Sequence, residues 1–79
     1  MQGASVKKKS LEDARTELLL TQVELANLAH VSISVVIGCE NGRAIRRLSA
    51  QALLKALNQK RKEEGESPLA FDDLGWIIQ

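Results

Sequence analysis

The sequence has few of the residues that build catalytic and metal centres. It contains one cysteine, one histidine and one proline, with one phenylalanine, one tryptophan and no tyrosine. A single cysteine cannot form an internal disulfide, and together with a single histidine it cannot complete a tetrahedral zinc site. No glycine-rich phosphate loop is present, and no group of side chains suggests catalysis. We therefore expect no enzyme and no metal or other cofactor.

Long apolar runs are also missing. No stretch approaches the roughly 18 apolar residues that a membrane-spanning helix needs. Lys7, Lys8 and Lys9 are not followed by the apolar core of a signal peptide, because Glu12 and Asp13 interrupt it. A chain of 79 residues with 44% hydrophobic and 27% charged residues has the composition of one globular domain. We expect a soluble, cytoplasmic protein with no membrane partner.

The charges are unevenly distributed although the net charge is only +1. Residues 1–62 contain all eleven Lys and Arg residues and five acidic residues, whereas residues 63–79 contain the other five acidic residues and no base. A basic body with an acidic C-terminal extension is typical of a protein that binds a polyanion. The alternative is chance clustering of charges on solvated surfaces.

Two regions are predicted from periodicity. Residues 1–9 show none and are expected to form a flexible basic N-terminal tail, whereas residues 10–79 form a single domain that includes the acidic extension at 63–79. Ser10 is a suitable N-cap for a first helix, and Thr21 with Glu24 forms the T-x-x-E pattern of a capping box for a second.

A longer helix is expected near the C-terminus. Ser49 is its predicted N-cap, and Ala50 to Glu64 consists mostly of strong helix formers. Gly65 suits the position after a helix, and Pro68 prevents its continuation.

The segment HVSISVVIGCENG, residues 30–42, alternates like a β-strand and ends in Asn-Gly, a common hairpin turn. No alternating run long enough to pair with it is present, and a two-stranded ribbon alone is marginally stable. Ser32 can act as an N-cap, and Val36 and Cys39 then lie on one inward face. Asn41-Gly42 serves equally well as a helix C-terminus. A helix is therefore favoured over a strand.

Residues Leu11 to Leu57 resemble the lambda-repressor-like (Cro/cI, XRE) helix-turn-helix family. The stretch QVELANLAHVSISVVIGCEN, residues 22–41, is similar to the family's twenty-residue helix-turn-helix unit, and Glu40-Asn41-Gly42-Arg43 resembles its E-x-G-[KR] signature. Arg15 matches a first-helix arginine that in several members forms a structural salt bridge with the glutamate found here as Glu40. The resemblance implies an all-α bundle of four to five short helices with a central helix-turn-helix.

The resemblance also implies which residues meet DNA. The second helix of the unit, about residues 32–40, would enter the major groove. The base-facing positions are Ser32, Ile33, Ser34, Ile37 and Gly38, and the phosphate-facing positions are Gln22, Arg43, Arg46 and Arg47. None of the base-facing residues can make the bidentate contacts that carry most base readout. The two isoleucines would either contact thymine methyl groups or be buried against another protein surface.

Two residues depart from the family pattern. His30 stands in the turn where glycine is usual, and histidine tolerates the left-handed conformation better than most residues. Leu19 stands where glycine is frequent after the first helix, so strain or a shifted loop is expected there.

The C-terminal extension is the predicted dimer or partner surface. Its apolar residues are Phe71, Leu74, Trp76, Ile77 and Ile78. The sequence therefore predicts a small, sequence-specific regulator of transcription, repressor-like, that binds double-stranded DNA as a homodimer. The alternative is an antitoxin-like or adaptor module that uses the same fold to bind a protein partner.

Overall fold

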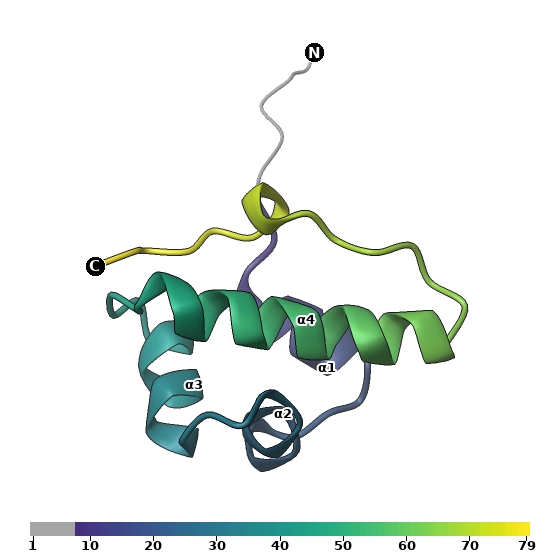
Figure 1. Cartoon of the computed structure of the whole chain (residues 1–79), viewed down its shortest axis with the longest axis horizontal. Coiled ribbons are helices and arrows are strands. Elements are labelled where there is room, and N and C mark those ends of the chain that lie inside the picture. Colours follow the sequence, from purple (N-terminus) through teal and green to yellow (C-terminus); the bar gives the residue numbers. More distant parts are fainter. Residues whose placement is uncertain (1–7) are drawn as a thin grey trace.

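The computed structural model of the chain describes residues 8–79, which form a helical domain. The helices are α1 (Leu11–Glu17), α2 (Gln22–Ala29), α3 (Ile33–Glu40) and α4 (Arg47–Glu63), followed by a short 3-10 helix, η1 (Phe71–Asp73). In Figure 1, α4 crosses the molecule, α3 lies near its N-terminal end, and the C-terminal segment returns along the side of α4 opposite α2. Residues 8–79 contain two isolated β-bridges but no β-strand. The prediction of an all-α fold is confirmed.

The first two helices begin at the predicted caps. The Ser10 hydroxyl accepts a hydrogen bond from the backbone N–H of Asp13 at 3.0 Å. The Thr21 hydroxyl accepts from the Glu24 N–H at 3.0 Å, and the Glu24 carboxylate accepts from the Thr21 N–H at 2.8 Å. Both halves of the capping box are thus present, and these caps satisfy amide groups that the short helices leave unpaired.

The strand-like segment is helical, as predicted. α3 covers Ile33–Glu40, and Ser32 occupies its N-cap position without a side-chain capping hydrogen bond. His30 adopts a left-handed conformation with φ of 58°, and Gly42 after the helix has φ of 85°. Leu19 also has a positive φ, of 59°, which confirms the strain expected at this position.

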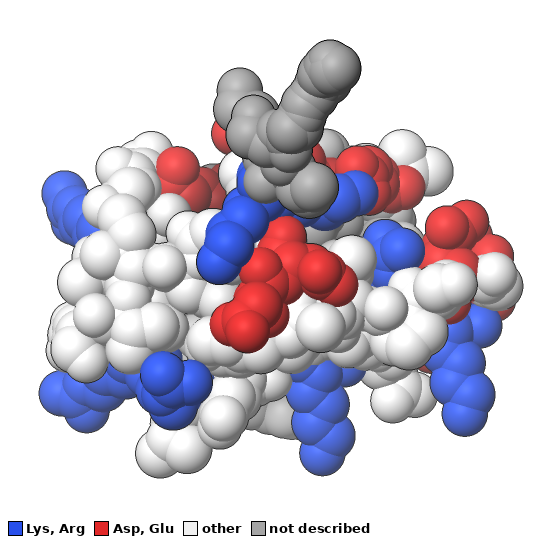
Figure 2. Space-filling model, turned by 90° about the horizontal axis from the view of Figure 1, so that it is seen from above, with Lys and Arg blue, Asp and Glu red and all other residues white. Residues whose placement is uncertain are grey.

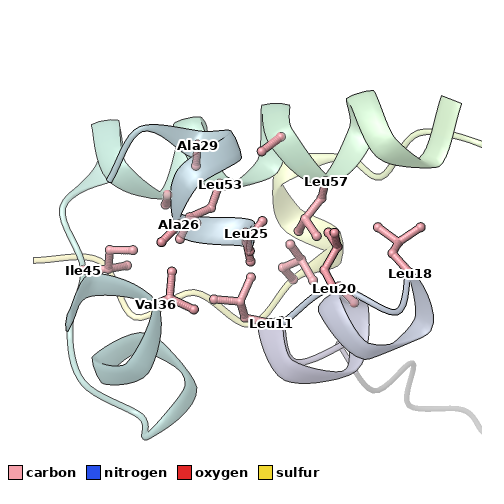
Figure 3. Packing of buried hydrophobic residues seen from close by; sticks show 14 residues of the cluster. Leu11, Leu18, Leu20, Leu25, Ala26, Ala29, Val36, Ile45, Leu53 and Leu57 are labelled. Carbon is pink, nitrogen blue, oxygen red and sulfur yellow. The ribbon is translucent and has the colours of Figure 1, made fainter. Parts of the chain in front are cut away.

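The core lies between the four helices. Leu25 and Ala26 of α2, Val36 of α3 and Leu53 and Leu57 of α4 meet there, as Figure 3 shows. α2 packs against both α3 and α4. It therefore fixes the position of α3 relative to the rest of the domain.

The start of α4 differs from the prediction. The helix begins at Arg47, with Arg46 as its N-cap, and ends at Glu63, so Ser49 lies inside it and is not the cap. Backbone pairing holds the preceding loop in place, because the N–H of Ile45 donates to the carbonyl of Ile77 at 2.7 Å and that of Gln79 donates to the carbonyl of Ile45 at 3.0 Å.

Further hydrogen bonds hold the C-terminal segment against α4 and against Lys9. The side-chain amide of Asn58 donates to the Leu69 carbonyl at 2.9 Å and accepts from the Leu69 N–H at 2.8 Å. Lys9 forms a parallel bridge with Leu74. The flexible tail was expected to extend to residue 9, and this boundary is wrong for Lys9. Residues 1–7, including Lys7, lie outside the described residues.

Candidate nucleic-acid interface

The N-terminal half of α3 exposes apolar and hydroxyl groups together. Ile33 and Ile37 are 38% and 37% exposed, although isoleucine is usually buried. They are four residues apart and therefore lie on one face of the helix. Ser32 and Ser34 beside them are exposed, and the Ser32 hydroxyl makes no capping hydrogen bond. Four of the five predicted base-facing residues thus lie at the surface.

Gly38 is the exception, and its predicted base-facing position is wrong. It is buried, and a Cβ atom placed there would lie 3.5 Å from Cδ of Arg43. The backbone N–H of Arg43 donates to the Gly38 carbonyl at 2.8 Å. The loop after α3 therefore folds back over Gly38 and places Arg43 beside the C-terminal half of the helix.

Asn41 was not among the predicted site residues. It is the exposed C-cap of α3 and follows Ile33 and Ile37 at the same four-residue spacing. That spacing is visible in the sequence, but the Asn-Gly pair was interpreted as a turn or helix end and not as a DNA contact.

Two of the three predicted phosphate-binding arginines lie next to the exposed face of α3. Arg43 and Arg46 line a hollow of about 200 Å³ together with Ser34 of α3. Both arginines are exposed, and neither guanidinium group forms a hydrogen bond or ion pair within residues 8–79. Arg47 is placed differently, because its guanidinium lies over the ring of Phe71, 5.2 Å from the ring centroid.

The end of α3 is held by a partly buried polar network. Arg15 of α1 donates from Nε to one carboxylate oxygen of Glu40 at 2.6 Å and from a terminal nitrogen to the other at 3.1 Å. The predicted salt bridge is therefore present, and the two side chains are only 12% and 5% exposed. Arg15 also donates to the Leu20 carbonyl at 2.8 Å. The hydrogen bond to Glu40 raises the pKa of Arg15 above its ordinary value, so the guanidinium stays charged.

Gln22 belongs to the same network. Its side-chain amide donates to Glu40 at 2.9 Å, which occupies a donor that a phosphate contact would use. The backbone N–H groups of Gln22 and Val23, in the first turn of α2, make no hydrogen bond within residues 8–79. Amide groups at a helix N-terminus attract phosphate. The backbone amides at the start of α2 are therefore free to meet a phosphate, and the Gln22 side chain has one N–H left for such a contact.

Charge separates α3 from the C-terminal segment. Among residues 30–47, which include α3 and its flanking loops, Glu40 is the only acidic residue, and it is paired with Arg15. Figure 2 views the molecule from the side of the C-terminal segment, and this face carries acidic side chains in its middle and at its right-hand end, with Lys and Arg side chains beside them. The α3 region is therefore the more favourable surface for a polyanion.

The predicted dimer surface is partly internal. Leu74 is 2% exposed and belongs to the core, so its assignment to a partner surface is wrong. Phe71 and Trp76 are partly buried and stack with their ring centroids 5.6 Å apart, and the Trp76 indole N–H donates to the Phe71 carbonyl at 2.9 Å. Ile78 is partly buried against the core, whereas Ile77 is 52% exposed.

Burial affects the cysteine of α3. Cys39 is partly buried against the core. Desolvation raises the pKa of its thiol, and the negative charge of Glu40 raises this pKa by a smaller amount. No cluster of three His, Cys, Asp or Glu side chains suited to a metal ion occurs within residues 8–79. Over the same residues, no helix is long and apolar enough to cross a membrane.

Comparisons of the chain with protein-family models, with curated proteins and with solved structures find no match. What the chain does must therefore be inferred from the geometry and chemistry of its own surface.

Proposed function

We propose that the chain is a lambda-repressor-like helix-turn-helix domain that binds double-stranded DNA and regulates transcription, with α3 as the recognition helix. One observation carries the proposal. Ser34, which is exposed on α3 beside Ile33 and Ile37, lines the same hollow as Arg43 and Arg46, whose guanidinium groups have no hydrogen-bond or ion-pair partner within residues 8–79. In helix-turn-helix proteins the second helix enters the major groove while flanking groups contact the backbone.

The side chains of α3 and the cationic groups around it have separate roles in this proposal. Arg43, Arg46 and the first backbone amides of α2 contact phosphates, which gives affinity and orientation without reading sequence. The side chains of α3 contact base edges. The Arg15–Glu40–Gln22 network connects α1, α2 and α3, so it keeps the recognition helix and the start of α2 in a fixed relation to each other.

Fluorescence anisotropy with mixed-sequence duplexes tests DNA binding. We expect binding at about 50 mM salt that weakens steeply toward 200 mM, because bound cations are released from the DNA. Arg43→Ala and Arg46→Ala should each reduce the slope of log affinity against log salt by about 1. Lys62→Ala is the matched control, because Lys62 is an exposed cation at the end of α4 remote from α3 in Figure 1. Absence of binding at about 50 mM salt would refute the proposal.

A second function is favoured by the apolar character of the same face. Ile33 and Ile37 suit the groove of a protein partner, as in an antitoxin-like or adaptor module. Ile33→Glu separates the two functions. Loss of DNA affinity with an unchanged oligomeric state supports DNA binding, whereas loss of an oligomer or protein complex with DNA affinity intact supports the alternative.

Dimer formation is part of the proposal, since such domains bind two half-sites about one helical turn apart. Of the C-terminal apolar residues, Ile77 is the one that remains exposed for a partner. Analytical ultracentrifugation with and without duplex DNA would show whether two copies bind together.

A further inference from the structure

The hydrogen-bonding capacity of α3 is unusually small for a recognition helix. From Ser32 to Glu40, only two serines, Cys39 and Glu40 carry polar side-chain atoms. Glu40 is 5% exposed and is bound by Arg15 and Gln22. Cys39 is partly buried against the core. The two serine hydroxyls remain, and a hydroxyl donates to or accepts from any base.

Within Ser32–Glu40, the groups that can discriminate between bases are therefore apolar, and the exposed amide of Asn41 lies beyond the end of the helix. In the major groove, the C5 methyl group of thymine is the apolar feature that distinguishes one base pair from another. Methylation of cytosine at C5 places a methyl group at the same position. We infer that Ile33 and Ile37 read pyrimidine C5 methyl groups, so that the domain prefers thymine over uracil and 5-methylcytosine over cytosine. This inference rests on the proposed DNA-binding function.

The spacing of the two isoleucines fits such readout. Residues four apart are separated by about 6 Å along a helix axis, and successive base pairs are about 3.4 Å apart. A helix lying along the groove would then place Ile33 and Ile37 over methyl groups about two base-pair steps apart. Ser34, on the same exposed side, is free to bond an adjacent base or phosphate.

Charge decides in favour of DNA as the occupant of this face. Arg43 and Arg46 share a hollow with Ser34, on the exposed side of α3, and have no anionic partner within residues 8–79, and the neighbouring acid, Glu40, is already paired. DNA offers phosphates that pair with the arginines and methyl groups in the major groove that contact the isoleucines. A purely apolar protein groove would leave the two guanidinium groups unpaired.

The test begins by selecting preferred sequences for the full chain from a random duplex pool. One selected duplex is then synthesised with thymine or uracil at single positions, which changes only a methyl group on the DNA. We expect each contacted methyl group to account for about fourfold in affinity, from the free energy of burying one such group. Replacing the same T·A pair by C·G should weaken binding, and 5-methylcytosine should restore most of it.

Two variants complete the design. Ile33→Ser and Ile37→Ser should each abolish the thymine–uracil difference at one position, with circular dichroism showing that the fold is retained. Arg46→Ala should weaken binding to both duplexes by the same factor and leave their ratio unchanged.

Each remaining outcome is decisive. Equal affinity for the thymine and uracil duplexes, with salt-dependent binding retained, overturns methyl readout but leaves the proposed DNA-binding function in place. Salt-dependent binding with no enriched sequence has the same consequence, because methyl readout requires a sequence preference. Absence of binding to any duplex overturns both proposals.

Discussion

Arg15 of α1 and Glu40, the last residue of α3, are joined by two hydrogen bonds of 2.6 and 3.1 Å between side chains that are only 12% and 5% exposed. The pair connects the first helix of the domain to the end of the proposed recognition helix. Gln22 adds a third donor to the same carboxylate. Every helix that contributes to the proposed DNA surface is therefore tied to one glutamate.

Removing one partner of this pair should destabilise the domain strongly. Arg15→Met and Glu40→Leu should each lower the free energy of unfolding by about 2 kcal/mol, because each leaves a partly buried charge without its partner. The double variant should recover most of the loss. Urea unfolding of the four proteins gives the coupling energy.

An exposed ion pair supplies the control for these Arg15 and Glu40 variants. Lys60 and Glu63 lie 3.8 Å apart with side chains 32% and 56% exposed. Lys60→Met should change stability by no more than about 0.5 kcal/mol. Single Arg15 or Glu40 variants as stable as the Lys60 variant would show that the buried pair does not hold α3.

Relieving backbone strain at Leu19 should stabilise the domain. Leu19 has φ of 59° and its side chain is 89% exposed, so Leu19→Gly loses no buried contact. We expect a gain of about 1 kcal/mol, measured by thermal unfolding. Thr16→Gly, at an exposed position within α1, should instead destabilise by about 0.4 kcal/mol. A loss of stability in both variants would mean that Leu19 is not strained.

The two neighbouring apolar residues Leu74 and Ile77 should respond differently to truncation. Leu74→Ala should lower the free energy of unfolding by about 3 kcal/mol, because it opens a cavity in the core. Ile77 is 52% exposed, so Ile77→Ala should change the stability of the monomer by less than about 0.5 kcal/mol. Chemical denaturation at low protein concentration measures both. A tolerated Leu74→Ala would argue against the packing of the C-terminal segment seen here.

The Cys39 thiol should ionise at higher pH in the folded protein than in the unfolded chain. Burial raises the pKa of this thiol, so its contribution to stability is present below the pKa of the unfolded chain and is lost as the pH rises through the folded-state pKa. Alkylation by iodoacetamide across a pH series, with and without urea, measures the two midpoints. Coincident midpoints would show that the thiol is not desolvated.

Local signals in the sequence were enough to locate the first three helices. The hydroxyls of Ser10 and Thr21 cap helices within three residues of themselves, so their effect does not depend on distant parts of the chain. The same holds for Gly42, whose positive φ follows from the turn it makes. For residues 30–42 the absence of a second alternating run to pair with was the signal that favoured a helix over a strand, since Ser32 makes no capping hydrogen bond.

Features that depend on contacts between distant parts of the chain could not be predicted from local signals in the sequence. α4 begins at Arg47 without a side-chain cap, after a loop that is held by pairing of Ile45 with Ile78. Leu74 is buried where the segment pairs with Lys9, while the equally apolar Ile77 is exposed. Gly38 is covered because Arg43 folds back over it. Hydropathy alone does not distinguish these cases.

The most direct test of the account is a titration of the ¹⁵N-labelled protein with a selected duplex, followed by two-dimensional amide NMR. We predict that the largest shifts fall on residues 32–37, on Arg43 and Arg46, and on the first turn of α2, while the C-terminal half of α4 and residues 66–70 stay unchanged. Shifts confined to α4 or the acidic C-terminal segment, or no shifts at saturating DNA, would contradict the assignment of α3 as a recognition helix.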